Sequence, residues 1–122
     1  MNMNILVIDD DAAVRKFICT TLTREHHNVF EADNGKTGLQ MLAQHPEVEL
    51  MVTDLIMPEK EGIETIMEAR QSHPELKIVA MSGGGKVGPE NYLVLADALG
   101  ANVTLKKPFS AQELLLSLKF ME

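Results

Sequence analysis

The chain has 122 residues, 45% of them hydrophobic, which suits one core, and we expect residues 1–122 to form a single domain. Its 18 acidic residues against 11 Lys and Arg give a net charge of −7, and it has no Trp; this balance argues against direct nucleic-acid binding, because acidic surfaces repel phosphates. With one cysteine, Cys19, the chain cannot form an internal disulfide. It has no basic leader and no run of roughly 20 apolar residues, so we expect a cytoplasmic protein without membrane contact.

Short apolar runs alternate with helical patterns along the chain. The first run reads Asn-Ile-Leu-Val-Ile, which is typical of a strand covered on both faces. The pattern predicts, in chain order, a strand at 4–8, a helix from 12 to about 25 or 26, a strand at 28–32, a helix ending at His45-Pro46, a strand at 49–54, a helix at 61–72, a strand at 76–81, a helix at 90–99, a strand at 102–106 and a helix through about 120. Such alternation implies a doubly wound α/β domain, with a parallel sheet, helices on both faces and right-handed crossovers.

Side chains suited to capping stand before several of these helices. Asp11 precedes the first helix, and we expect it to be an N-cap rather than a third metal ligand. Either Asp33 or Asn34 can cap the second helix, and Ser110 with Glu113 forms a capping box before the last. The residues expected to face the core from the helix at 61–72 are Ile63, Ile66, Met67 and Ala69.

Polar side chains follow several predicted strands, at the ends that share one edge of a parallel sheet. They are Asp9 and Asp10, Asp54, Ser82 and Lys107. Crowded carboxylates repel one another unless a cation neutralises them, and oxygen ligands with spare water positions suit Mg²⁺. A carboxylate beside Mg²⁺ can act as a nucleophile toward phosphorus, while a Lys and a hydroxyl can hold the transferred phosphoryl oxygens. The set therefore predicts that Asp54 accepts a phosphoryl group, with Mg²⁺ as the cofactor.

Four short segments carry a more specific signal. They read Ile-Leu-Val-Ile-Asp-Asp-Asp at 5–11, Val-Thr-Asp-Leu-Ile-Met-Pro-Glu-Lys-Glu-Gly at 52–62, Val-Ala-Met-Ser-Gly at 79–83 and Leu-Lys-Lys-Pro-Phe at 105–109. In this order they resemble the receiver domain of two-component response regulators, and the resemblance covers essentially the whole chain. It implies a flavodoxin-like (βα)5 fold, a doubly wound parallel five-stranded sheet with strand order 2-1-3-4-5.

The resemblance also implies a role for each acidic position. Asp54 corresponds to the phosphoacceptor of the family. Asp10 corresponds to the direct Mg²⁺ ligand and Asp9 to its water-mediated or assisting partner. The backbone carbonyl of Ile56 is implied as a further ligand of the metal.

The remaining site positions are also implied by the resemblance. Ser82 takes the Ser/Thr switch position, and Lys107 matches the Lys that precedes Pro in the family, so the bond to Pro108 is expected to be cis. The chain departs from the family at Thr104, where an aromatic residue often swings inward on phosphorylation. We therefore expect the Gly-rich loop after Ser82 to carry the switch instead.

As a function, the resemblance implies a stand-alone receiver that is phosphorylated on Asp54 by a sensor histidine kinase or a phosphotransfer protein. Phosphorylation would switch a protein-interaction surface for an unknown downstream protein, in motility control or another relay, with the chain a monomer or weak dimer. Such a protein is not an enzyme beyond its own phosphorylation and dephosphorylation. Because neither Ile56 nor Gly84 has a side chain that can orient a water, we expect slow self-dephosphorylation.

Three other functions are compatible with a fold of this kind, and the sequence disfavours each of them. A degenerate receiver, acting as a phosphorylation-independent binding module, would lack some of the site residues, and all of the functional types are present here. A phosphatase of the aspartyl-phosphate type requires a second Asp two positions after the nucleophile, whereas this chain has Ile56 there. A flavin binder of similar fold requires a phosphate-binding loop after the first strand. This chain has three Asp residues there, and their negative charge would repel phosphate.

Overall fold

A computed structural model of the chain describes residues 2–55, 62–83, 94, 99–119 and 121. The strands are β1 (Asn4–Ile8), β2 (Asn28–Ala32), β3 (Leu50–Asp54), β4 (Lys77–Ser82) and β5 (Val103–Lys106). The helices are α1 (Ala12–Arg24), α2 (Gly35–Gln44), α3 (Gly62–Ser72) and α5 (Ala111–Lys119). These bounds agree with the predicted elements to within two residues, except that most of the predicted helix at 90–99 lies outside the described residues.

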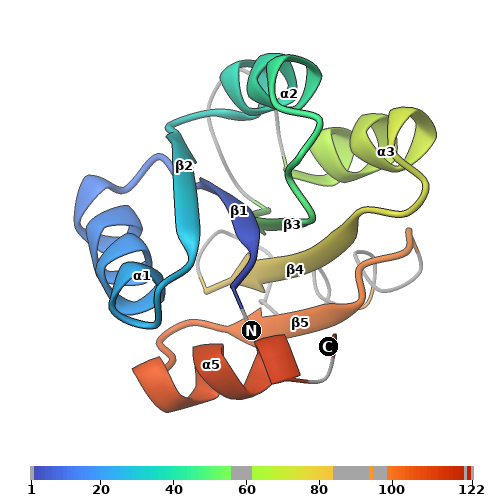
Figure 1. The fold of residues 1–122 in the computed structure, drawn as a ribbon. Helices are drawn as coiled ribbons and strands as arrows, with labels where there is room; N and C mark the ends of the chain where they lie inside the picture. The colour runs from blue at the N-terminus through green and yellow to red at the C-terminus, as the bar shows by residue number, and fades with distance from the viewer. Residues whose placement is uncertain (1, 56–61, 84–93, 95–98, 120, 122) are drawn as a thin grey trace.

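The five strands form one parallel sheet in the order β2-β1-β3-β4-β5, which confirms the predicted flavodoxin-like topology. Figure 1 shows α1 and α5 on one face of this sheet and α2 and α3 on the other. The register aligns the carboxyl ends of the central strands, since Asp54 is level with Met81 and Ser82 is level with Lys106. All strand ends that carry predicted site residues therefore meet along one edge.

Two apolar cores fill the space between the sheet and its helices, and alternate residues of each strand supply them. In β1, Leu6 and Ile8 belong to the core under α2 and α3, whereas Ile5 and Val7 belong to the core under α1 and α5. All four side chains have no exposed surface. From Ile5 to Ile8, β1 is buried on both faces and wholly apolar, and the first acidic residues follow Ile8 directly.

Local capping fixes where the helices begin. The Asp11 carboxylate accepts from the backbone N–H groups of Ala13 (2.9 Å) and Val14 (3.3 Å), which confirms it as the N-cap of α1. Asn34, rather than Asp33, caps α2 through Thr37 N. The predicted capping box is also confirmed, because Ser110 N donates to Oε1 of Glu113 and Glu113 N donates to Oγ of Ser110.

One predicted core position is wrong. Met67 is 46% exposed, although Ile66 and Ala69 of the same helix are buried. The inward face of α3 is instead completed by Thr65, a polar residue with no exposed surface. In the part of the chain described here, no helix has the length and apolar character that crossing a membrane requires.

Candidate functional site

The edge of the sheet at the strand carboxyl ends brings the predicted site residues together. Asp9 directly follows β1, Asp54 ends β3, Ser82 ends β4 and Lys107 directly follows β5. The central strands β1, β3 and β4 supply three of these four positions. The groups therefore converge near the point where the strand order reverses, which is the usual ligand position in open α/β sheets. Backbone pairing extends beyond β5, since Lys107 N donates to the carbonyl of Ser82 at 2.9 Å.

Three carboxylates form the acidic part of the site. One oxygen from each of Asp9, Asp10 and Asp54 lies within 4.8 Å of the other two. Asp9 has no exposed surface and Asp54 is 7% exposed, whereas Asp10 is open to solvent. The Oδ1 atom of Asp9 accepts from Asp11 N at 2.9 Å, which fixes the orientation of the buried carboxylate. An all-oxygen set with one ligand facing water fits the preferences of Mg²⁺.

Lys107 reaches into this acidic cluster. Its Nζ atom lies 2.9 Å from Oδ2 of Asp9 and 3.4 Å from Oδ1 of Asp54. Burial by itself lowers the pKa of Lys107, but the hydrogen bond to Asp9 and the charge of Asp54 outweigh it, so the pKa lies above its usual value. The ammonium therefore stays charged at neutral pH and offsets part of the carboxylate repulsion.

The site disfavours the ionisation of Asp54. Burial raises its pKa from 3.8 to about 6; the Lys107 ammonium lowers it, and the negative charge of Asp9 raises it again. Leu55 N donates to Oδ1 of Asp54 at 3.0 Å and so holds one carboxylate oxygen in place. Among the described residues, the three carboxylates of the site carry more negative charge than the Lys107 ammonium neutralises, a condition that a divalent cation would relieve.

Ser82 supplies a hydroxyl whose bonding capacity is unused. It has no exposed surface, and its Oγ atom makes no hydrogen bond to any residue in the described parts of the chain. A buried hydroxyl without a partner is unfavourable by about 1–3 kcal/mol, so such a group usually has a specific reason to be there. A ligand oxygen at this edge would give it a partner.

Two glycines allow backbone segments of the site to approach each other closely, and neither was predicted from the sequence to have a role there. A Cβ atom on Gly62 would lie 2.1 Å from the carbonyl oxygen of Asp54, and one on Gly83 would lie 2.3 Å from Cβ of Lys107. Gly62 also donates from its N–H to the carbonyl of Leu55 at 3.0 Å. Both glycines stand in the segments that carry the family resemblance, and that position was the available signal.

Arg15 is a second contributor that sequence reasoning missed. Its Nη1 atom donates to the carbonyl of Asp9 at 2.8 Å, and its Nε atom pairs with Oε1 of Glu31 at 3.2 Å. The guanidinium therefore ties the segment after β1 to β2 and α1. No local pattern distinguishes this Arg from an ordinary surface residue of a helix.

The other predicted positions have mixed outcomes. The Lys107–Pro108 peptide bond is cis, as expected. Ile56 and Gly84 lie outside the described residues, so the predicted carbonyl ligand stays a prediction. Thr104 is half-buried in β5. Cys19 is buried in α1, and burial raises the pKa of its thiol to about 12, which makes it unreactive.

An apolar hollow of about 470 Å³ adjoins the acidic cluster. Val14 and Phe17 of α1 line one side, and Lys107, Pro108 and Phe109 line the other. The rings of Phe17 and Phe109 lie 6.3 Å apart, and Phe17 is 41% exposed. Exposed aromatic surface beside a cluster of charged side chains is typical of a place where a partner docks.

Comparisons with known proteins agree with this geometry. The family model described as the response regulator receiver domain matches residues 5–119. A chemotaxis protein CheY homolog of Campylobacter jejuni is 33% identical over 116 residues, which cover 92% of this chain and 86% of that protein. The response regulator receiver protein CpdR of Brucella abortus is 32% identical over 119 residues, with coverage of 96% and 94%.

Other relatives are longer than this chain. A probable transcriptional regulatory protein of Picosynechococcus is 37% identical over 117 residues, yet the match spans only 45% of its length. Among solved structures, a response regulator receiver domain protein from Clostridium thermocellum superposes with a TM-score of 0.88 at 26% identity, covering 97% of this chain and 92% of that one. The receiver domain of NtrX from Brucella abortus superposes with a TM-score of 0.87 at 28% identity, with 95% of each chain covered. Sequence, topology and site composition therefore agree, and the chain belongs to the response regulator receiver domain family.

Proposed function

We propose that this receiver domain accepts a phosphoryl group on Asp54 from a phosphohistidine of a sensor histidine kinase or a phosphotransfer protein. One observation carries the proposal: Asp9, Asp10 and Asp54 converge to within 4.8 Å, and the Lys107 ammonium contacts two of them. A structural ion pair would need one carboxylate for one ammonium. Three carboxylates leave an excess of charge that suits a divalent cation and a phosphoryl group.

In the transfer, an Asp54 carboxylate oxygen attacks phosphorus while the bond from phosphorus to the donor imidazole nitrogen breaks, and the imidazole leaves and takes a proton from solvent. The Lys107 ammonium can turn from Asp9 and Asp54 to a phosphoryl oxygen, and the Ser82 hydroxyl can donate to another. Mg²⁺, held by Asp9, Asp10, Asp54 and the Ile56 carbonyl, would supply positive charge to the phosphoryl oxygens when bound.

The change in partners of Ser82 and Lys107 is the proposed origin of switching. Ser82 ends β4 directly before the Gly-rich segment, so a new bond from its hydroxyl pulls on that connection. Lys107 lies in the segment that joins β5 to α5, so a change in the partner of its ammonium would shift that segment. The downstream partner is a protein that distinguishes these two arrangements. The relatives named chemotaxis and transcriptional regulatory proteins support a signalling role without fixing the pathway.

The phosphodonor is proposed to dock beside the site, on the apolar hollow lined by Phe17 and Phe109. From there a donor imidazole can approach the edge where Lys107 lies. Slow self-dephosphorylation is part of the same proposal, because Ile56 and Gly84 provide no side chain that positions a water. A purified phosphorylated protein that loses its phosphoryl group within seconds would contradict that part.

The test is phosphorylation of the purified chain with acetyl phosphate and Mg²⁺, followed by intact mass spectrometry. We expect the mass to increase by one phosphoryl group in the wild type and in Asp33→Asn, which removes an exposed carboxylate after β2 as a matched control. The increase should be absent in Asp54→Asn and in EDTA. An increase that Asp54→Asn retains would overturn the proposed acceptor.

A phosphorylation-independent binding module would give no mass increase at all. Beryllofluoride, which mimics a bound phosphoryl group, separates that outcome from a strict preference for a protein donor. Binding that requires Asp54 and Mg²⁺ would mean that the site is intact and selects its donor. Absence of binding would favour the degenerate module.

A further inference from the structure

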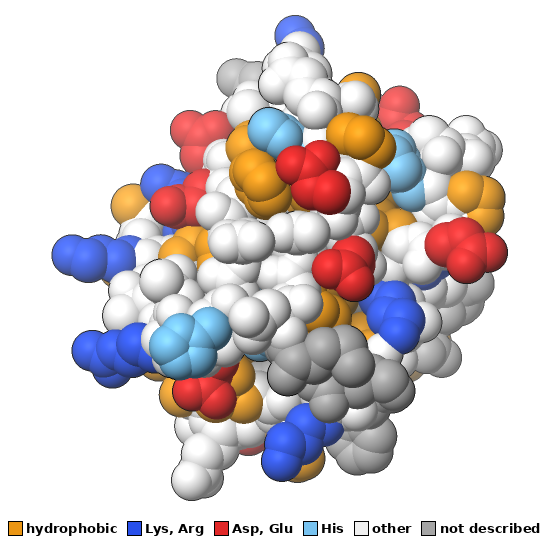
Figure 2. Space-filling view, in the orientation of Figure 1, with side chains coloured by type: hydrophobic (Ala, Val, Ile, Leu, Met, Phe, Trp, Pro, Cys, Tyr) orange, Lys and Arg blue, Asp and Glu red, His pale blue; other side chains and the backbone are white. Residues whose placement is uncertain are grey.

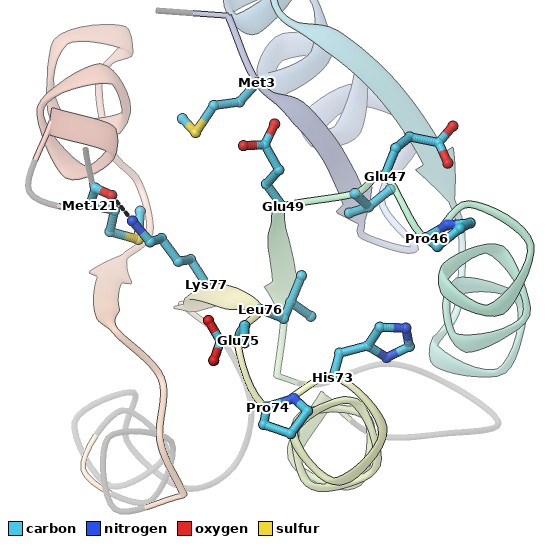
Figure 3. Close-up of a pocket in the computed structure, with 11 residues that line it drawn as sticks. Met3, Pro46, Glu47, Glu49, His73, Pro74, Glu75, Leu76, Lys77 and Met121 are labelled. Atoms are coloured by element: carbon cyan, nitrogen blue, oxygen red, sulfur yellow. Dashed lines mark hydrogen bonds between the residues drawn. The ribbon is translucent and has the colours of Figure 1, made fainter.

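The opposite edge of the sheet, where the strands begin, carries a hollow of about 530 Å³. Figure 3 shows that side chains before β3 and before β4 surround it, with Met3 and Met121 on a third side. Asp54 lies at the other end of β3, so this hollow is separate from the candidate phosphoacceptor site. Figure 2 shows this face of the molecule, with acidic and apolar side chains side by side near its centre.

Two turns of matching sequence form the walls. Residues 45–48 read His-Pro-Glu-Val and residues 73–76 read His-Pro-Glu-Leu. Each turn is closed by the same backbone hydrogen bond, Val48 N to the His45 carbonyl at 3.1 Å and Leu76 N to the His73 carbonyl at 3.0 Å. They enter β3 and β4, which are direct neighbours in the sheet. The hollow is therefore bounded by two equivalent and rigid turns, each with a proline that fixes the backbone.

The rim of the hollow is negatively charged. Glu47 and Glu75 occupy the same position in the two turns, and Glu49 stands between them at the start of β3, all three exposed. Within the described parts of the chain, none of these carboxylates has a Lys or Arg partner; Glu47 pairs with the His45 imidazole at 3.5 Å, and Glu49 accepts from Asn4 N at 3.1 Å. Among the described residues that line the hollow, Lys77 is the only lysine, and its ammonium donates a hydrogen bond to the carbonyl of Met121 (Figure 3).

The floor of the hollow is apolar. Val48 and Leu76 close it from the two turns, and Met3 and Met121 close it from the chain ends, all at most 7% exposed. Pro46 and Pro74 add exposed ring surface at the walls. An apolar floor under an acidic rim suits a ligand that is itself amphipathic, with an aliphatic group for the floor and cations for Glu47 and Glu75, the glutamates of the two turns.

We propose that this hollow binds a short basic segment of another protein, in which Lys or Arg side chains stand on both sides of an aliphatic residue. The aliphatic side chain covers Val48 and Leu76, and the flanking cations pair with Glu47 and Glu75. The repeated turn supplies one carboxylate on each side, which matches two cations along one peptide. Because the hollow lies at the edge remote from Asp54, this surface is available whether or not the receiver is phosphorylated.

The experiment is a titration of the ¹⁵N-labelled chain with the peptide acetyl-Lys-Leu-Leu-Lys-amide, followed by amide chemical shifts. We expect shifts at the backbone amides of Val48, Leu76 and Lys77, with little change beside Asp54. In the double variant Glu47→Gln/Glu75→Gln, binding should weaken by about tenfold, since the two carboxylates that pair with the peptide cations are lost and, of the three glutamates on the rim, only Glu49 remains. Both positions are exposed, so the fold should be retained, and the amide spectrum itself reports whether it is.

Controls distinguish this site from general acidity. Glu25→Gln removes one exposed charge at the end of α1 and should leave the titration unchanged. The peptide acetyl-Glu-Leu-Leu-Glu-amide should not bind. Shifts that survive the double variant, that map to other amides, or that stay absent at millimolar peptide would each overturn the proposal. Spermidine binding as tightly as the basic peptide would also overturn it, because charge alone would then account for the affinity.

Discussion

The ammonium of Lys107 lies 2.9 Å from Oδ2 of Asp9, a carboxylate with no exposed surface. A buried carboxylate is tolerated only when paired and hydrogen-bonded, and Asp9 has Lys107 on one oxygen and Asp11 N on the other. The same ammonium is 3.4 Å from Asp54. Lys107 therefore stabilises the free protein, and in the proposed function it also binds a phosphoryl oxygen.

Lys107→Met should destabilise the metal-free protein by roughly 2–4 kcal/mol, because it leaves the Asp9 carboxylate buried and unpaired. Added Mg²⁺ should restore part of this loss, since the cation neutralises the same carboxylates. Urea denaturation with EDTA or with Mg²⁺ measures both effects. Lys16→Met removes the same charge from an exposed side chain of α1 and should change stability much less. Equal losses for the two variants would contradict a specific pairing of Lys107 with Asp9.

Asp54→Asn should stabilise the metal-free protein at high pH. The folded-state pKa of Asp54 is about 6, above its ordinary value of 3.8, because burial disfavours the charged form. The folded state therefore binds the proton more tightly, and ionised Asp54 opposes folding above pH 6 but not below pH 4. We expect Asp54→Asn to raise the free energy of unfolding by about 2 kcal/mol at pH 8.

The same gain should shrink as the pH falls from 6 toward 3.8 and should be close to zero at about pH 3, where Asp54 is protonated in both the folded and the unfolded state. Denaturation curves in EDTA at several pH values provide the measurement. Asp33→Asn, at an exposed position, should give a small and pH-independent difference. A stabilisation by Asp54→Asn that is equal at pH 3 and pH 8 would indicate that ionisation is not its cause.

Ser82→Ala should separate stability from ligand binding. The Ser82 hydroxyl is buried without a partner among the described residues, so its removal should cost nothing or stabilise the free protein by up to about 1 kcal/mol. Beryllofluoride binding should nevertheless weaken by about tenfold, because one donor to the bound group is lost. Thr53→Val removes a neighbouring buried hydroxyl that does donate, to the Asp54 carbonyl at 3.0 Å, and should destabilise instead. Unchanged beryllofluoride affinity in Ser82→Ala would remove Ser82 from the site.

The sheet and its functional edge could be predicted because they depend on local patterns. The central strands β1, β3 and β4 are short, largely apolar runs with a polar residue at or directly after their carboxyl ends, and parallel topology then places Asp9, Asp54 and Lys107 on one edge. Caps such as Asp11 act within three residues of themselves, so their roles also follow from local sequence.

What could not be predicted depends on contacts between distant segments. Arg15 reaches the Asp9 carbonyl and Glu31, and neither the distance nor the direction of that reach is encoded in the spacing of its helix. Met67 has the correct helical spacing but lies past the edge of the core, because Thr65 takes the inward place. The hollow at the other edge could not be predicted from local sequence, because it depends on the pairing of β3 with β4, which brings the turns at 45–48 and 73–76 together.

Gly62→Ala and Gly38→Ala form the sharpest test of how closely the backbone is packed at the site. A Cβ on Gly62 would meet backbone atoms, the Asp54 carbonyl oxygen at 2.1 Å and Leu55 Cα at 2.5 Å, which cannot move without shifting the end of β3. A Cβ on Gly38 would meet Cδ1 of Ile8 at 2.3 Å, the far end of a side chain that can rotate. Alanine also favours a helix interior over glycine by about 1 kcal/mol, which offsets part of the cost at Gly38.

We therefore expect Gly62→Ala to destabilise the protein by more than about 3 kcal/mol and to reduce phosphorylation by acetyl phosphate, since Asp54 itself is displaced. Gly38→Ala should cost about 1–2 kcal/mol and leave phosphorylation of the folded protein unchanged, because Ile8 faces the core under α2. Urea denaturation and mass spectrometry measure the two effects separately. If Gly62→Ala folds and is phosphorylated like Gly38→Ala, the segment before α3 does not hold Asp54 in position.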